Sequence, residues 1–185
     1  WTFGTGNQAL GVLPLNLGSL WSFVAVAGSG LTNSNSDGET ILDGDVGIFP
    51  GNSCMGDGNP CTALNPLISG TLFADDAGMV AARAKADLAA AAADALSRPA
   101  GVIVNDLSGM TLAPGVYTSA STMSIAVDGT VTLDGGGDQD AVFIFQIGSS
   151  LTVNNGAEIV LINGARARNV FWVASASSTL GSDVS

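Results

Sequence analysis

A short motif recurs at nearly constant intervals in the second half of the chain, and this repeat limits the fold more than any other feature. Ser121-Thr122-Met123 is followed by Ser149-Ser150-Leu151 and then by Ser178-Thr179-Leu180, at offsets of 28 and 29 residues. Residues 129–133 similarly recur after 27 to 28 residues as residues 156–161. Short apolar runs separated by turn residues favour three strands in each period. The sequence therefore predicts a β-solenoid of stacked coils.

The clearest coil divides into three strands, residues 141–147, 151–154 and 158–162. The first strand is apolar almost throughout, which predicts burial on both of its faces. The second strand alternates, so that Leu151 and Val153 point inward while Thr152 and Asn154 point outward. This alternation predicts an outward row of small, uncharged residues in successive coils. Its members are Thr122, Ser124, Ala126, Thr152, Asn154 and Thr179, with Thr32 and Ser34 in an N-terminal coil.

One segment, at about residues 72–97, is rich in alanine and other strong helix formers. Asp75 and Asp76 near its start and Arg98 near its end suit the helix dipole, and Pro99 stops the helix. A stripe of mostly small residues recurs along it at spacings of three or four: Phe73, Met79 or Val80, Ala84, Leu88, Ala91 and Ala95. We therefore expect one long α-helix, packed against the most apolar side of the solenoid.

The charge balance excludes two classes of partner. With 16 acidic and 5 basic residues the chain has a formal net charge of -11, which repels nucleic-acid phosphates and anionic lipid headgroups. No apolar run approaches the roughly 20 residues that a membrane-spanning helix needs. We expect neither a nucleic acid nor a membrane as partner.

Catalytic and metal-binding residues are scarce. The sequence contains no histidine, which excludes a Ser-His-Asp or Cys-His nucleophile. Paired carboxylates such as Asp43 with Asp45 lie in glycine-bounded turns, where carboxylates most often bond to backbone amides. Residues 134–140 contain three aspartates, so a bound cation such as calcium is the alternative to turn chemistry there. We expect no enzyme, no cofactor and no metal.

Two cysteines, Cys54 and Cys61, flank a turn-rich loop. Because no histidine is present to complete a zinc site, we predict a local disulfide, with two free thiols as the alternative. A disulfide implies an oxidising compartment. No signal peptide opens the chain, which we interpret as removal of a leader from a secreted protein.

Several longer segments carry a more specific signal. They are residues 112–117 (LAPGVY), 140–151 (DAVFIFQIGSSL), 163–165 (NGA) and 169–172 (NVFW), with residues 44–51 (GDVGIFPG). These segments resemble the microbial ice-binding protein family over roughly residues 18 to 181. The resemblance implies a mostly β fold: a right-handed, three-sided, discontinuous β-solenoid with one long α-helix alongside. It also implies a secreted protein that binds ice through the outward row of small residues.

Two features depart from that family. Its members usually continue with a further coil or two beyond the corner at Ser178-Thr179-Leu180, so we expect the domain of residues 18–185 to lack the usual C-terminal coil. Residues 1–17 form an extension with no place in the family. The extension is uncharged and presents an apolar set, Trp1, Phe3, Leu10, Val12 and Leu13. We expect it to be buried, either in its own solenoid or in a neighbouring copy. An alternative function follows: a subunit or adhesin of an extracellular filament, joined by strand complementation between copies.

Overall fold

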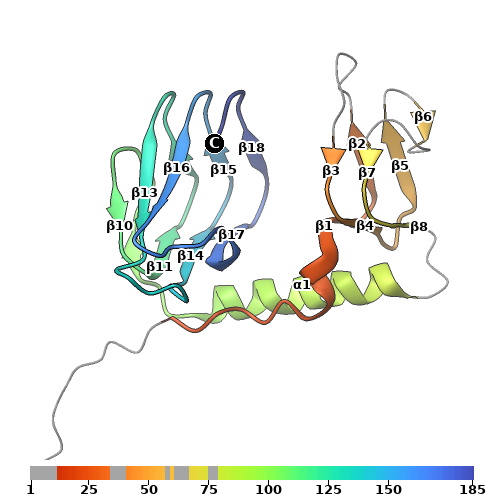
Figure 1. Cartoon of the computed structure of the whole chain (residues 1–185), viewed down its shortest axis with the longest axis horizontal. Helices are drawn as coiled ribbons and strands as arrows, with labels where there is room; N and C mark the ends of the chain where they lie inside the picture. Colours follow the sequence, from red (N-terminus) through yellow and green to blue (C-terminus); the bar gives the residue numbers. More distant parts are fainter. Residues whose placement is uncertain (1–11, 34–40, 57–58, 61–66, 75–78) are drawn as a thin grey trace, which may run out of the picture. The chain divides into compact units, whose positions relative to one another are not determined.

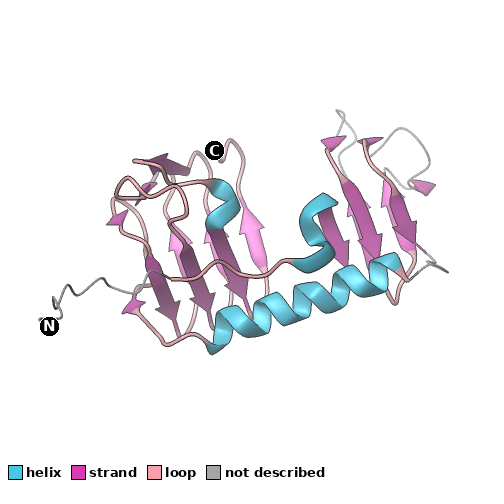
Figure 2. Ribbon diagram, turned by 60° about the horizontal axis from the view of Figure 1, so that its bottom comes forward, coloured by secondary structure: helices cyan, strands magenta, loops and turns pink. Residues whose placement is uncertain are grey.

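The computed structural model describes residues 12–33, 41–56, 59–60, 67–74 and 79–185, which belong to two compact units (Figure 1). The N-terminal unit spans residues 16–93. The C-terminal unit combines residues 94–185 with the chain up to Leu15. Each unit contains its own set of parallel strands, as Figure 2 shows.

Three parallel sheets form the C-terminal unit, with strand orders β17-β14-β11-β9, β12-β15-β18 and β10-β13-β16. The strands are β9 (Val102–Ile103), β10 (Thr111–Leu112), β11 (Gly115–Ser119), β12 (Met123–Ile125), β13 (Thr130–Asp134), β14 (Phe143–Ile147), β15 (Leu151–Val153), β16 (Glu158–Ile162), β17 (Val170–Ala174) and β18 (Ser178–Leu180). From β10 onward, successive strands of the chain enter the three sheets in turn. This arrangement is a three-sided solenoid with one strand per side in each coil, as the sequence predicts.

The strand register corrects one interval of the repeat. Met123 pairs with Leu151 at an offset of 28 residues, but Leu151 pairs with Ser178, at an offset of 27 rather than the 29 of the motif. The similarity between the serine-rich motifs therefore misplaces the third strand by two residues. Because side chains alternate with a period of two, this shift leaves the inward and outward assignments unchanged.

The core of the C-terminal unit runs along the inside of the three sheets. Every residue of β14 is buried, in agreement with its apolar sequence. Tyr117, Phe145 and Trp172 occupy equivalent positions in three successive coils and stack, with ring centroids 5.3 and 3.9 Å apart. Stacked aromatic rings of this kind contribute beyond the area they bury, so the ladder ties adjacent coils together.

The N-terminal unit contains a 3-10 helix, short strands and most of the long helix. Its elements before that helix are η1 (Gly18–Ser22), β1 (Phe23–Ala27), β2 (Gly30–Asn33), β3 (Ile41–Leu42), β4 (Asp45–Ile48), β5 (Ser53–Gly56), β6 (Asn59–Pro60), β7 (Leu67–Ile68) and β8 (Leu72–Ala74). The sheets have the orders β1-β4-β8, β2-β5-β6 and β3-β7, parallel except for β5 with β6. Val46, Ile48 and Cys54 form the buried core of these strands. Cys54 is not a free thiol, but Cys61 lies outside the described residues, so their pairing stays a prediction.

The long helix, α1 (Val80–Ser97), ends where the sequence predicts but begins later. Leu72–Ala74 form strand β8, which pairs with β4, so tertiary pairing overrides the expected helical start. Asp75 and Asp76 lie outside the described residues. The predicted stripe is correct at Ala84, Ala91 and Ala95, which are buried, together with Ala81. It is wrong at Met79, Val80 and Leu88, which are exposed.

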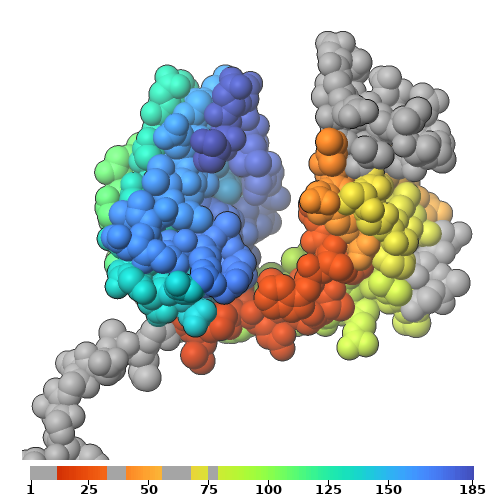
Figure 3. Space-filling view, in the orientation of Figure 1, coloured from red at the N-terminus to blue at the C-terminus, as the bar shows by residue number. Residues whose placement is uncertain are grey.

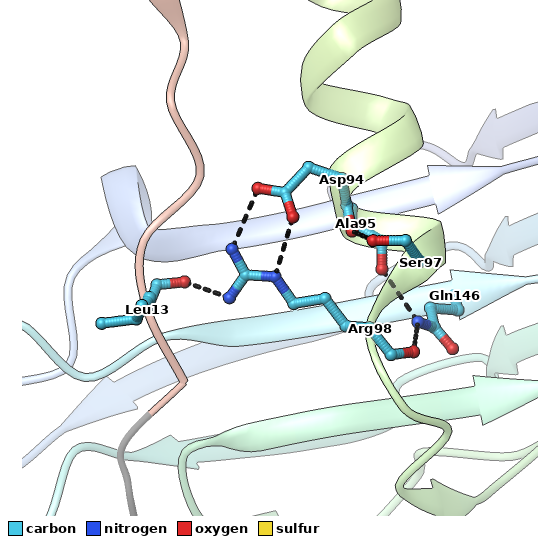
Figure 4. Close-up of polar contacts among 6 residues, drawn as sticks. All are labelled: Leu13, Asp94, Ala95, Ser97, Arg98 and Gln146. Carbon is cyan, nitrogen blue, oxygen red and sulfur yellow. Dashed lines mark hydrogen bonds and ion pairs between the residues drawn. The ribbon is translucent and has the colours of Figure 1, made fainter.

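The C-terminal end of α1 is bonded to the solenoid (Figure 4). The side-chain amide of Gln146, in β14, donates to the backbone carbonyls of Ala95 and Arg98 at 2.8 and 2.9 Å. Arg98 in turn pairs with Asp94 and donates to the carbonyl of Leu13. These bonds satisfy carbonyl groups that a helix end leaves without partners. The helix end thus covers the buried side of the solenoid, as expected.

Candidate functional site

The sheet β12-β15-β18 presents a row of small polar side chains on its outer surface. Ser124, Thr152 and Thr179 pair in register across its three strands. Ser124 and Thr152 are partly exposed and Thr179 is exposed. The residues on either side of Ser124 and Thr152 in their strands are buried, which confirms the predicted alternation. Adjacent strands of a sheet lie about 4.7–4.9 Å apart, so the row is regularly spaced.

Two further rows flank this one, because backbone hydrogen bonds extend the parallel register by a residue on each side of the strands. We call the nine positions the small-residue face: Thr122, Ser124, Ala126, Ser150, Thr152, Asn154, Ser177, Thr179 and Gly181. The Ser177 hydroxyl donates to that of Ser150 at 3.0 Å. The Asn154 amide donates to the carbonyl of Ile125 at 2.7 Å. Neighbouring coils are therefore linked across the surface of the face.

Sequence reasoning missed Ser150, Ser177 and Gly181. The cause is the two-residue error in the third interval, which aligned Ser150 with Thr179 instead of Ser177. It also missed Asp106, which forms an isolated bridge with Ser124 and so stands next to the central row. The backbone amide and hydroxyl of Ser108 donate to Asp106 at 2.9 and 2.7 Å, which lowers the pKa of its carboxyl. An ionised carboxylate therefore marks this edge of the face at neutral pH.

The other two sides of the C-terminal unit differ in chemistry. The sheet β10-β13-β16 also aligns small residues, Thr111 and Thr132, but Val160 follows them in the row. Its neighbouring rows carry Asp134 and Glu158. The sheet containing β14 is covered by the end of α1 through Gln146. Of the three sides, the small-residue face is the one that combines exposure with uncharged side chains.

The carboxylates of residues 134–140 bond to turns. Asp134 accepts hydrogen bonds from the backbone amide of Gly136 and the side chain of Asn163, at 2.8 and 2.9 Å, and both lower its pKa. Asp138 accepts one from the backbone amide of Asp140 at 2.8 Å. Within the described ranges, no group of three or more His, Cys, Asp or Glu side chains is arranged to hold a metal ion. These contacts favour turn chemistry over a cation site.

The remaining predicted residues lie elsewhere. Thr32 is exposed in β2 of the N-terminal unit, where it pairs with Met55, and Ser34 lies outside the described residues. So do Trp1, Phe3 and Leu10. Val12 is half-buried, whereas the side chain of Leu13 is 74% exposed. The expected burial is therefore wrong for Leu13, which is held through its backbone carbonyl instead. Among the helices that the structure describes, none is apolar and long enough to cross a bilayer.

A parallel, three-sided solenoid with one uncharged face of small residues defines a class of proteins that act through a surface instead of a cleft. Residues 25–185 match the family described as ice-binding-like, and the chain belongs to this family. This membership confirms the resemblance seen in the sequence.

Proteins similar to this chain come from several organisms. It is 37% identical over 172 residues to the ice-binding protein of Nostoc sp. (strain HG1), covering 89% of this chain and 57% of that protein. It is 34% identical to ice-binding protein 1 of Shewanella frigidimarina (strain NCIMB 400), covering 90% of this chain and 21% of the relative. The chain thus spans little more than half of the first relative and about a fifth of the second.

Solved structures share the fold. The crystal structure of an ice binding protein from an Antarctic biological consortium matches with a TM-score of 0.80 at 37% identity, covering 94% of this chain and 74% of that one. An ice-binding protein from the Antarctic ascomycete Antarctomyces psychrotrophicus matches with a TM-score of 0.76 at 32% identity, covering 91% and 77%. These names refer to ice binding alone, so the filament alternative gains no support from them.

Proposed function

We propose that this protein binds ice through the small-residue face and thereby inhibits ice growth and recrystallisation. The observation that carries the proposal is the in-register row Ser124, Thr152 and Thr179, on an uncharged side of a solenoid that belongs to the ice-binding-like family. The names of the similar proteins support the same function.

The chemistry of the face suits a solid water surface. Methyl groups restrict the orientation of the water next to them, and the hydroxyls of Ser124, Thr152 and Thr179 give that water anchoring points. Strand spacing fixes the distance between side chains in one direction, and the two-residue alternation, roughly 6.5–7 Å along a strand, fixes it in the other. Such a grid orders adjacent water without the strong hydration that charged groups would impose. Ordered water of this kind then merges with the ice lattice.

A bulky substitution at the centre of the face tests the proposal. Thr152→Tyr breaks the flatness of the face without entering the core, so we expect crystal shaping and recrystallisation inhibition to be lost. The matched control is Thr132→Tyr, at the outward centre of β13 on the neighbouring side, which we expect to retain both activities. Circular dichroism should show that both variants keep the fold. Unchanged ice shaping in Thr152→Tyr, or equal loss in the control, would remove this face from consideration.

We also propose that the protein acts outside the cell. The relatives' function supports this placement, since ice crystals grow in the surrounding water. The bonded state of Cys54 suits an oxidising compartment. Fractionation of the source cells tests it, because an extracellular protein is recovered from the medium instead of the cell lysate.

A further inference from the structure

The last coil of the C-terminal unit leaves the inside of the solenoid open. Strands β16, β17 and β18 lie at the edges of their three sheets, and Figure 3 shows these coils, in blue, at the surface of the unit. The residues around this opening enclose a cavity of about 440 Å³, and nine of its ten lining residues are apolar. They include Val153, Val170 and Leu180.

The aromatic ladder of the core ends at this cavity. Phe145 is stacked between Tyr117 and Trp172, whereas Trp172 stacks on Phe145 and also lines the cavity. Trp172 is only half-buried, although Phe145 is fully buried. An aromatic side chain placed in the cavity would continue the ladder by one step.

The chemistry of the opening favours a polypeptide strand over a small molecule. Small-molecule pockets combine apolar walls with a few convergent polar groups, but here the one polar residue of the lining is Ser185. The edge strands around the cavity instead offer backbone donors and acceptors, which an extended peptide can pair with. The occupant should therefore be an extended, apolar and uncharged segment.

Residues 1–11 of this chain have that chemistry. They read WTFGTGNQALG, with two large aromatic residues and no charge. A segment without charge approaches a surface of net charge -11 with no electrostatic repulsion. The stretches at residues 34–40, 57–58 and 75–78, which also lie outside the described residues, all contain acidic residues.

The anchor of this segment lies away from the cavity. Leu15 is buried and the carbonyl of Leu13 is bonded to Arg98, so residues 12–15 are fixed within the C-terminal unit. Figures 1 and 2 show the described chain leaving this unit beside β9 and β11, whereas β17 is the opposite edge strand of the same sheet. Donor and acceptor therefore lie at opposite ends of one unit, which suits a contact between copies.

We propose that residues 1–11 of one copy add as a strand to the open coil of a second copy, with Trp1 or Phe3 in the cavity against Trp172. Each copy then offers one donor segment and one acceptor coil. Such a head-to-tail contact repeats from copy to copy and yields a filament unless its rotation closes a ring. The inference goes beyond ice binding and does not depend on it, because the strands it pairs with are edges and not the small-residue face.

The size of the particle in solution tests the proposal. We expect residues 1–185 to form polymers, visible by light scattering and electron microscopy, and the variant lacking residues 1–10 to be a folded monomer. Leu180→Glu places a charge at the cavity rim on a side chain that is 66% exposed, and should also give monomers. Val127→Glu is the matched control, since Val127 is 63% exposed outside the cavity and should leave the polymers intact.

A peptide experiment identifies the donor. A synthetic peptide of residues 1–11 carrying Trp1→Phe should bind the shortened monomer at one peptide per chain and change the fluorescence of Trp172, a change that Trp172→Phe abolishes. Polymers that persist without residues 1–10 would overturn the proposal. So would a monomeric parent chain, whether deletion of residues 1–10 then opens the cavity to a hydrophobic dye, as self-complementation predicts, or changes nothing.

Discussion

Adjacent residues of β15 meet opposite environments, and this contrast governs how substitutions act there. Val153 is 2% exposed and belongs to the core of the C-terminal unit, while Thr152 is on the outer surface. Binding and folding are therefore assigned to alternate positions of one short strand. A change in the outward row affects the surface alone, and a change in the inward row affects the whole coil.

Val153→Asp should unfold the C-terminal unit, because the new carboxylate is buried without a partner. We expect the free energy of unfolding to fall by at least about 4 kcal/mol, as measured by denaturant titration. Thr152→Asp is the matched control, since its charge points to solvent and should cost little stability. If Val153→Asp were as stable as the parent chain, the inward assignment of β15 would be wrong.

Acid should weaken the fold through carboxylates held by hydrogen bonds. The amide of Gly136 and the side chain of Asn163 lower the pKa of Asp134, so its ionised form stabilises the folded state above the ordinary carboxyl pKa of roughly 3.9. That contribution disappears as the pH falls through the lower pKa of the folded state. Asp134→Asn keeps an acceptor oxygen but cannot titrate. We expect the melting temperatures of the two proteins to converge below about pH 4, and a difference that stays constant from pH 7 to pH 2 would contradict this account.

At the level of elements, sequence alone predicted the sides of the solenoid better than their alignment. Strand β16 occupies the expected residues, and β14, β15 and β17 lie within a residue or two of theirs, because apolar runs and turn residues delimit them. The third strand of the small-residue face was misaligned because serine repeats outside the core imitate a register. Pairing is decided by which side chains enter the core, and Leu180 enters beside Val153, not Leu151.

The start of α1 shows a second limit of sequence reasoning. Alanine-rich composition is a local preference, whereas the strand at Leu72–Ala74 depends on β4, more than twenty residues earlier in the chain. The end of the helix was predictable because Arg98 and Pro99 mark it locally. The amide that fixes this end, that of Gln146, lies about fifty residues away and has no local signal.

Gln146 should prove necessary for the attachment of α1. Replacing it with Met keeps the volume but leaves the carbonyls of Ala95 and Arg98 without their donor, which should cost about 1–3 kcal/mol. Gln146→Glu should cost more, because a carboxylate would face two carbonyl oxygens. Thermal unfolding measures both effects, with Gln139→Met, at an exposed position, as the control. Equal stability of the Met variant and the parent chain would mean that the bonds to the helix contribute nothing.

At the level of the whole molecule, the two units differ in how they are stabilised. The C-terminal unit has a continuous buried core of fifteen residues, whereas the core described in the N-terminal unit comprises Val46, Ile48 and Cys54. A cross-link compensates for a small core. The sequence predicted the cysteine pair as a staple but not that the buried residues divide in this way, because contacts between distant segments decide it.

Reduction should therefore act on one unit. If Cys54 and Cys61 are joined, the oxidised protein is two hydrogens lighter than the reduced one by mass spectrometry. Reduction should then raise amide hydrogen exchange in β4 and β5 while leaving β13 to β15 unchanged, since the short closed loop contributes about 2 kcal/mol to its own unit. Two thiols that alkylate without prior reduction would exclude the bond.

The parallel pairing described above also bears on how such chains change length over generations. In the C-terminal unit each residue of β14 pairs with one 28 positions earlier and one 27 positions later. An insertion or deletion of any other size inside a coil would turn inward side chains outward or move them past their partners. Gain or loss of one whole coil preserves every remaining pair, and loop closure over about 28 residues costs the same for each coil. Viable length variants of this solenoid should therefore differ by whole coils, with smaller changes confined to the corners.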